Sequence, residues 1–364
     1  MKFQTIGFIG LGLIGGSIAK KIKSSDPGTR IYATAHRKAT IEEAYGEGLI
    51  ENQELLPLSA FSDCDCIFLC APVQRNIDYL RQLKAVIKES CLITDVGSTK
   101  TEIHEEVIRL GLEHNFIGGH PMTGSEKTGI KNADPQLLEN AYYIITPTAA
   151  TADSAITEFR DFVVSLGSIP LILDYRAHDY STAAISHLPH MIAFSLVNMV
   201  QNIDDKNETM KTIAAGGFHD LTRIAASSPE MWQNICASNR KCLLSLMDQY
   251  MDSLKELRGY ISSSDEEALL EYFARARDYR ESFPLKRVKS PDRFYALLVD
   301  LADEAGGIAS IAGILAAAGI SIKNIGIVNN REFASGVLRI EFEDDPSLSR
   351  ASELLTQRGY VIHP

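Results

Sequence analysis

The stretch TIGFIGLGLIGGSIAKKIKSS, residues 5–25, opens the chain with a short apolar run that ends in spaced glycines. Because a helix-compatible segment follows, the pattern predicts a strand, a tight turn and a helix. The first glycine allows the turn, the second lets the backbone approach a pyrophosphate, and the third lets the helix pack closely on the strand. The helix N-terminus adds amide donors and a partial positive charge. An alternative is a turn used only for packing. We predict a dinucleotide site that includes Gly10, Gly12, Leu13, Ile14 and Gly15.

A second strand is predicted in TRIYATAHRK, residues 29–38, and its end departs from the usual dinucleotide pattern. An acidic residue about 20 positions beyond the last glycine commonly accepts the ribose hydroxyls of NAD. We assign that position to Ala35, which is followed by His36 and Arg37. Loss of the acid removes repulsion against a 2′-phosphate, and Arg37 can pair with one, so these residues favour NADP or weak discrimination. Alternatively, Arg37 stacks on the adenine or points into solvent.

Strand-like and helix-like runs alternate through the first half of the chain. Further strands are predicted within residues 64–73, 91–98, 115–121 and 141–147. The alternation predicts an α/β, doubly wound Rossmann-type domain over residues 1–173. Ligands of such sheets lie beyond the carboxyl ends of the strands. The residues that the sequence places there are Ala71, Pro72, Asp95, Ser98 and His120.

The stretch FIGGHPMTGSEKTG, residues 116–129, places a histidine between two glycines and a proline. It is too broken for a helix interior and too polar for a buried strand. It is either an ordinary surface loop or a place where a base is held against a substrate. Since His120 falls at a strand end, we expect it where a nicotinamide ring and its substrate would meet.

From residue 174 to residue 284 the pattern is nearly all helical, and much of it is apolar on more than one face. Such faces need a cover, and a second subunit is one candidate for it. His187 and His190 have spacing three with a proline between them and lack the Glu of HExxH, so we predict no metal site. Arg223 lies in an apolar context and requires an anion, which is either a ligand or the nearby Asp220.

A basic, proline-bearing linker is predicted over residues 285–292, followed by a third unit over residues 293–364. This unit alternates strand, helix, strand, strand, helix, strand, and its first helix begins after Gly306 and Gly307. The pattern predicts a small βαββαβ sandwich.

The composition limits the class of protein. The chain has 364 residues, which favours two or three domains. A net charge of −11 argues against nucleic acid as a partner. No apolar run approaches the roughly 20 residues that span a bilayer, and no secretory signal is recognisable, so we expect no membrane association. The six cysteines lack zinc-like spacing, which favours reduced thiols in a cytoplasmic protein.

Six ordered motifs now carry a resemblance: GFIGLGLIGGS, DVGSTK, GGHPMTGS, SHLPH, GGFHDLTRIA and SSPEMW. In this order the chain resembles the prephenate dehydrogenase family, with its prephenate and arogenate relatives, over essentially its whole length. The final segment resembles an ACT domain, a regulatory amino-acid-binding module, although it lacks a proline–glycine turn after its first strand. The resemblance implies oxidative decarboxylation of prephenate to 4-hydroxyphenylpyruvate, in tyrosine biosynthesis, with hydride transfer to the cofactor.

That reaction needs a base or strong acceptor beside the substrate hydroxyl, and a neutral histidine suits the task near pH 7. His120 is our candidate, and the resemblance implies the same role, with Ser98 fixing the imidazole. Arg223 is the expected bidentate anchor for a substrate carboxylate, assisted by His187. Glu126 would tune the pocket by its charge, and Trp232 would either close it or simply pack in the core. The remaining candidate substrate contacts are Thr123, Gly124, Ser125 and Gly216.

The resemblance favours NAD, whereas Ala35 and Arg37 favour NADP or both, and we take NAD as the expected cofactor. It also implies tyrosine as a possible effector at the ACT-like unit. We expect a homodimer through the helical domain, because its apolar faces need a cover. Alternatives are an arogenate dehydrogenase and a β-hydroxyacid dehydrogenase, which would want a catalytic lysine on the second domain. A further alternative is a nucleotide- and amino-acid-sensing regulator that performs no chemistry.

Overall fold

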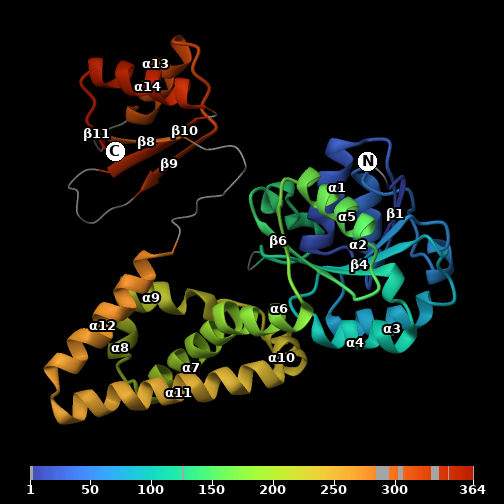
Figure 1. Ribbon diagram of the computed structural model, residues 1–364, viewed down its shortest axis with the longest axis horizontal. Coiled ribbons are helices and arrows are strands. Elements are labelled where there is room, and N and C mark those ends of the chain that lie inside the picture. The colour runs from blue at the N-terminus through green and yellow to red at the C-terminus, as the bar shows by residue number, and fades with distance from the viewer. Residues whose placement is uncertain are drawn as a thin grey trace. The chain divides into compact units, whose positions relative to one another are not determined.

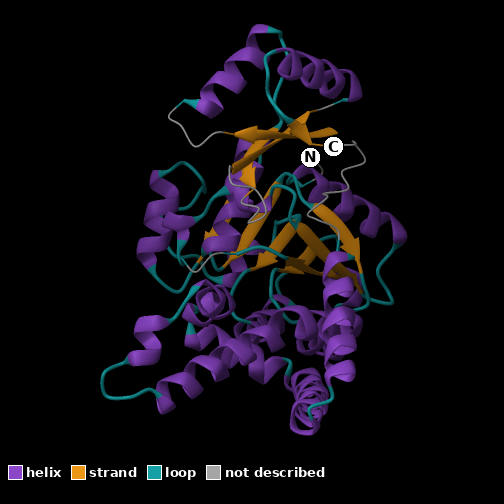
Figure 2. Cartoon of the chain, turned by 90° about the vertical axis from the view of Figure 1, so that its left-hand side faces the viewer, coloured by secondary structure: helices purple, strands orange, loops and turns teal. Residues whose placement is uncertain are grey.

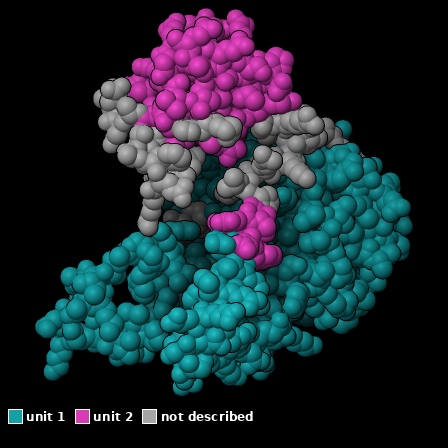
Figure 3. Space-filling model, turned by 60° about the vertical axis from the view of Figure 1, so that its left-hand side comes forward, with its two compact units in different colours: residues 1–277 teal, residues 278–364 magenta. Residues whose placement is uncertain are grey.

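A computed structural model describes residues 3–124, 127–283, 295–301, 306–328, 336–342 and 344–363. The chain forms two compact units, residues 1–277 and residues 278–364, which are coloured separately in Figure 3. Each unit is described by itself.

The first unit begins with a seven-stranded sheet of order β2-β1-β3-β4-β5-β6-β7. Strands β1, β4 and β6 of this sheet are labelled in Figure 1. Strands β1 to β5 run parallel, β6 is antiparallel to β5, and β7 is parallel to β6. The predicted doubly wound, Rossmann-type domain is therefore confirmed. The strands are β1 Thr5–Ile9, β2 Arg30–Thr34, β3 Cys66–Leu69, β4 Leu92–Asp95, β5 Phe116–Pro121, β6 Tyr142–Pro147 and β7 Ile169–Ile172. The helices between them are α1 Leu13–Ser25, α2 Lys38–Gly46, α3 Val73–Leu83, α4 Thr101–Leu110 and α5 Asp153–Ser165.

Both faces of the sheet are buried at its central strands β1 and β3, as expected for parallel strands joined by crossover helices. In β1, Phe8 belongs to one apolar cluster and Ile9 to the other, because successive side chains point to opposite faces. Phe68 of β3 stacks on Phe8 with ring centroids 5.0 Å apart. This packing fixes the strand ends, and with them the loops that carry the predicted site.

The remainder of the first unit is helical, as predicted (Figure 2). A π-helical turn, Ala183–His187, joins α6 to α7, so that the helix runs without a break past Pro189. Pro189 closely follows this π-helical turn, at a point where the regular helical hydrogen-bond pattern is already interrupted. The helices are α6 Tyr175–Thr182, α7 Leu188–Ile203, α8 Thr209–Ile213, α9 Gly216–Thr222, α10 Pro229–Ser238, α11 Arg240–Ser263 and α12 Glu266–Glu281, the last of which continues past residue 277 into the second unit.

The helical stretch Tyr175–Ile203 is longer and more apolar than the sequence pattern suggested. Its 29 residues and mean hydropathy of 1.3 suffice, by length and composition alone, to cross a membrane. Only 17% of its most apolar part is buried within the chain. Ile213 and Leu270, elsewhere in the helical region, are each 72% exposed, so the uncovered apolar surface extends beyond this one helix.

The second unit contains the order strand, helix, strand, strand, helix, strand that the sequence predicts. Its antiparallel sheet has the order β11-β8-β10-β9, and Leu338 and Ile340 of β10 are buried in its core. The predicted linker, residues 285–292, lies outside the described residues. The elements are β8 Tyr295–Leu301, α13 Gly307–Ala317, β9 Asn324–Val328, β10 Gly336–Phe342, α14 Asp345–Gln357 and β11 Ile362–His363.

Candidate active site

The glycine-rich turn lies beside the loop after β3, at the point where the strand order reverses between β1 and β3. Gly10 has φ +92°, and a Cβ there would lie 2.9 Å from the backbone carbon of Cys70. Gly15 is equally constrained, because its Cβ would lie 2.9 Å from the carbonyl oxygen of Gly10. These two glycines allow the close approach of turn, helix and neighbouring loop.

Gly12 differs from its two neighbours in the motif. A Cβ on Gly12 would meet nothing within 4 Å, and the residue caps α1 without a side-chain hydrogen bond to the helix. The turn thus leaves open space at a helix N-terminus, which is where a pyrophosphate is bound in this fold. Leu13 and Ile14 begin the helix there and are half-buried. These residues fit a dinucleotide.

The expected adenosine and nicotinamide contacts lie at the ends of the next strands. Ala35 directly follows β2 and is half-buried, whereas His36 and Arg37 are exposed. Ala71 and Pro72 follow β3. Their loop is held by the buried Asn76 amide, which accepts from the N–H of Ala71 and donates to its carbonyl oxygen.

Asp95, which we expected to bind the cofactor, has a structural role. Its side chain is fully buried and forms an ion pair with the fully buried Lys100. Its oxygens also accept from the N–H of Gly97, at 2.9 Å, and from the N–H of Gly119, at 3.3 Å. The carboxylate therefore ties the loop after β4 to β5, and its side chain is not available to a cofactor.

His120 lies near the carboxyl end of β5, as predicted, and is 9% exposed. Its Nδ1 lies 2.8 Å from Nε2 of His178 on α6. In turn, Nδ1 of His178 lies 2.9 Å from Oδ1 of Asp179. Sequence reasoning missed both α6 residues, although an adjacent His–Asp pair at the start of an apolar helix was a signal that could have been used.

Several groups disfavour a charged His120. Burial lowers the pKa of His120 well below its ordinary value, and the neighbouring His178, Lys100 and His187 act in the same direction. The imidazole is therefore neutral near pH 7, the state in which a histidine accepts a proton.

Ser98, the predicted partner of this imidazole, is half-buried in the loop after β4. In the described part of the chain no hydrogen bond joins Ser98 to His120, and the Nδ1 partner is His178 instead. Thr123 is half-buried and Gly124 exposed, in the loop that follows β5. Ser125 and Glu126 lie outside the described residues.

The helical region brings His187, His190 and Trp232 together. His187 is 2% exposed, and its Nδ1 lies 3.3 Å from Nδ2 of Asn239. His190 stacks on the Trp232 ring at 3.9 Å and donates from Nδ1 to the Ser186 carbonyl oxygen at 2.8 Å. Each histidine has its own partner, and the described residues hold no group of three or more His, Cys, Asp or Glu arranged for a metal ion.

Trp232 is 6% exposed, yet no described residue accepts a hydrogen bond from its indole Nε1–H. Burial without a partner is costly for such a donor. Packing against His190 and Phe194 accounts for the buried ring but leaves the N–H unsatisfied.

Arg223 and Gly216 are exposed, at the end and the start of α9. The suggested ion pair between Arg223 and Asp220 is wrong, since none forms between these two described residues and both are exposed. Arg223 instead lies close enough to His190 to help burial lower the pKa of that imidazole. A cationic side chain thus stands beside the His187, His190 and Trp232 cluster.

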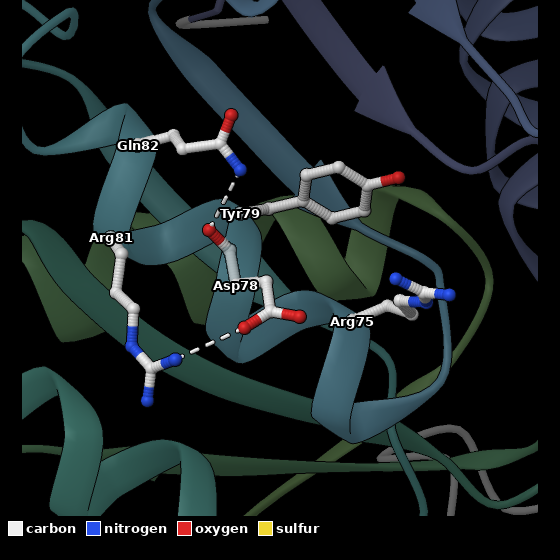
Figure 4. Close-up of a pocket in the computed structure, with 5 residues that line it drawn as sticks. All are labelled: Arg75, Asp78, Tyr79, Arg81 and Gln82. Atoms are coloured by element: carbon white, nitrogen blue, oxygen red, sulfur yellow. Dashed lines mark hydrogen bonds and ion pairs between the residues drawn. The ribbon is translucent and has the colours of Figure 1, made fainter.

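A separate pocket of about 360 Å³ lies on the surface of α3 (Figure 4). It is lined by one helix only, and an Arg81–Asp78 ion pair of 3.0 Å spans part of it. None of the predicted site residues lines this pocket. Its lining residues are Arg75, Asp78, Tyr79, Arg81 and Gln82.

Comparison with known proteins connects these features. The sequence model of the prephenate dehydrogenase nucleotide-binding domain matches residues 18–169, and that of the dimerization domain matches residues 174–275. Prephenate dehydrogenase of Bacillus subtilis is 37% identical over 358 residues, which covers 98% of this chain and 96% of that protein. The chain belongs to the prephenate dehydrogenase family.

Solved structures of the family agree with the fold. Prephenate dehydrogenase from A. aeolicus, in complex with hydroxyphenyl propionate and NAD+, has a TM-score of 0.72 and 29% identity. The match covers 77% of this chain and 98% of that one. Synechocystis arogenate dehydrogenase has a TM-score of 0.68 and 30% identity, over 77% and 99% of the two chains. The matched relatives are dehydrogenases, and the A. aeolicus enzyme was solved with NAD+, so the hypothesis of a non-catalytic regulator is set aside.

Proposed function

We propose that this enzyme converts prephenate to 4-hydroxyphenylpyruvate and carbon dioxide with reduction of NAD. The observation that supports this most strongly is His120, a buried neutral imidazole at the carboxyl end of β5 whose Nδ1 is already engaged by His178. Its Nε2 is the ring nitrogen left to accept a hydrogen bond from a substrate hydroxyl. The open turn at Gly12 supports a dinucleotide bound at the same edge of the sheet.

In the proposed reaction, His120 Nε2 accepts the proton of the ring hydroxyl as the carbinol carbon loses its hydride. When bound, the nicotinamide supplies the hydride acceptor. The bond to the ring carboxylate then breaks, carbon dioxide leaves, and its electron pair aromatises the ring. His120 returns the proton to the phenolate oxygen, so no net proton is released. Ser98, in the loop after β4, is proposed to hold the same hydroxyl.

Arg223 is proposed to bind a substrate carboxylate, with His187 assisting. Support comes from its lack of an ion pair with Asp220 and its position near His190. An exposed guanidinium gains most from a bidentate carboxylate partner. Thr123, Gly124, Ser125, Glu126, Gly216 and Trp232 remain proposed substrate contacts.

NAD is the proposed cofactor, and NADP is the alternative that Ala35 and Arg37 support. The half-buried Ala35 presents no carboxylate to repel a 2′-phosphate, and the exposed Arg37 side chain can reach one. Arogenate is the alternative substrate, favoured by the likeness to the Synechocystis enzyme.

The helical region is proposed to form a homodimer. The matched dimerization-domain model and the exposed apolar side chains of α7 and α11 support this, because such surface needs a cover. The second unit is proposed to be an ACT-like module that binds tyrosine, on the basis of its βαββαβ order. Unchanged activity at saturating tyrosine would count against that effector.

Steady-state reduction of NAD and of NADP, each with prephenate and with arogenate, tests the proposal. Turnover of prephenate with NAD is the expected result. A strong preference for NADP would assign the cofactor choice to Arg37, and a preference for arogenate would favour the alternative substrate. No turnover in all four combinations would contradict the proposed function.

A further inference from the structure

Three side chains from two parts of the first unit form a continuous buried chain of hydrogen bonds. Asp179 Oδ1 lies 2.9 Å from His178 Nδ1, and His178 Nε2 lies 2.8 Å from His120 Nδ1. His178 is fully buried and Asp179 is 1% exposed. His120 comes from β5, whereas the other two come from α6, so the chain joins the sheet to the helical region.

The direction of each hydrogen bond follows from the carboxylate. Burial raises the pKa of Asp179, but hydrogen bonds from His178, from Thr101 and from the backbone of Lys100 together outweigh it and lower that pKa. An ionised carboxylate only accepts, so His178 must donate from Nδ1. The pKa of His178 is lowered by burial, and a neutral His178 therefore offers Nε2 as an acceptor. His120 must then carry its proton on Nδ1, which leaves the lone pair on Nε2.

Several charged or titratable groups of the described residues act on these histidines. Lys100 lowers the pKa of both His120 and His178 and is itself paired with Asp95, which raises the pKa of His178. His187 also lowers the pKa of His120. The negative charge of Asp179 also raises the pKa of four neighbouring groups, Glu102, His104, His187 and Cys242.

We propose that His178 and Asp179 are positioning residues that set the tautomer of His120 and share the proton it accepts. The inference rests on the proposed function, because it assigns His120 as the acceptor. As Nε2 takes the proton of the substrate hydroxyl, the Nδ1 proton of His120 shifts toward His178 Nε2. The positive charge that develops is thereby placed beside Asp179. Return of the proton to the phenolate oxygen reverses both movements.

Asp179 also caps the start of α4, and a test has to separate this structural role from its hydrogen bond with His178. Its oxygens accept from the backbone N–H of Lys100, at 2.7 Å, and of Thr101, at 2.8 Å, at the start of α4. In an Asp179→Asn variant the amide nitrogen takes the Oδ1 position to face His178, so the carbonyl oxygen keeps the Thr101 N–H while the Lys100 N–H loses its acceptor. Its amide group would donate to His178 Nδ1, so both hydrogen bonds between residues 179, 178 and 120 reverse their direction. His120 would then carry its proton on Nε2 instead of Nδ1.

The tautomer itself is the first readout, and it needs neither substrate nor cofactor. Nitrogen-15 NMR of the histidine-labelled full-length enzyme, with His120 assigned by a His120→Asn variant, should show the proton on Nδ1. Asp179→Asn and His178→Leu should move it to Nε2. A wild-type His120 protonated on Nε2 would overturn the proposal, whatever the variants do and whether or not prephenate is the substrate.

Kinetics give the second readout. Asp179→Asn and His178→Leu should each lower kcat by about 100-fold or more, with KM for prephenate changed less than threefold. His178→Gln retains an acceptor for Nδ1 and should restore part of kcat. His104→Leu is the matched control, because His104 is also a fully buried histidine. It is hydrogen-bonded to Thr146 and takes no part in the hydrogen bonds that join Asp179, His178 and His120. The His104→Leu variant should keep kcat and the His120 tautomer. Full kcat in Asp179→Asn and His178→Leu with an unchanged tautomer would also overturn the proposal.

Discussion

His178 Nε2 lies 2.8 Å from His120 Nδ1, although 58 positions separate the two residues in the chain. One histidine is near the end of a sheet strand and the other is in the first helix of the helical region. The contact means that the conformation of the proposed base depends on how the sheet and the helical region pack together.

Alanine at two glycines of the first turn should have different effects, weaker NAD binding at Gly12 and lower stability at Gly15. Gly12→Ala adds a methyl group in open space, so stability should be retained while the Kd for NAD rises roughly 5- to 150-fold, since overpacking costs about 1–3 kcal/mol. Gly15→Ala is the matched contrast, because its methyl group would press on Gly10 and lower the free energy of unfolding. Calorimetric NAD titration and urea unfolding measure the two effects. Unchanged NAD affinity in Gly12→Ala would argue against a pyrophosphate at this turn.

Asp95→Asn should damage stability and leave cofactor binding intact. Breaking a buried ion pair leaves Lys100 uncompensated, so the free energy of unfolding should fall by about 3–5 kcal/mol. Asp161→Asn is the control, because it breaks an exposed pair with Arg160 and should cost less than about 1 kcal/mol. Urea unfolding measures the stability of both variants, and the KM for NAD measures whether their cofactor binding is intact. A raised KM with unchanged stability would restore Asp95 as a cofactor ligand.

Arg223→Ala should weaken prephenate binding without unfolding the enzyme. The side chain is exposed and has no ion pair with Asp220 to lose, whereas a charge-assisted contact to a carboxylate contributes about 1.5–3 kcal/mol. KM for prephenate should therefore rise roughly 10- to 150-fold, while KM for NAD stays constant. Arg160→Ala, on α5, serves as the control. Equal prephenate kinetics in both variants would exclude Arg223 as the anchor.

Stability should fall as the pH is lowered from 6.5 toward 4. Burial, with His178 and His190, lowers the pKa of His187 from 6.5 to about 4, although Asp179 acts in the opposite direction. Between these values the unfolded chain binds a proton that the native chain does not, so stability is lost as pH falls, by about 1.4 kcal/mol per pH unit. His187→Gln should reduce that loss, and urea unfolding at several pH values measures it. The exposed His114→Gln is the control and should leave the pH dependence unchanged.

The parts of the fold that local patterns encode could be predicted from the sequence. Gly10, Gly12 and Gly15 predicted the strand, turn and helix, because each glycine meets a local backbone or packing requirement. His120 was placed at a strand end by the same reasoning. The hydrophobic periods also predicted the helical region and the order of elements in the second unit.

Contacts made by tertiary packing were not predictable in this way. Asp95 is the last residue of strand β4, a position where cofactor ligands are expected, but its burial against Lys100 depends on how α4 packs. His178 and Asp179 meet His120 only because α6 returns to the sheet, and no local spacing records that contact. A proline such as Pro189 ordinarily breaks a helix, yet the π-helical turn before it allows the helix to continue.

The most direct test of the central claim compares wild type with His120→Asn for NADH formed from prephenate and NAD. Circular dichroism of both proteins verifies the fold. The account predicts one NADH per carbon dioxide in the wild type and a kcat lowered about 10²- to 10⁴-fold in the variant, the usual contribution of a general base. Full turnover by a folded His120→Asn enzyme would contradict it.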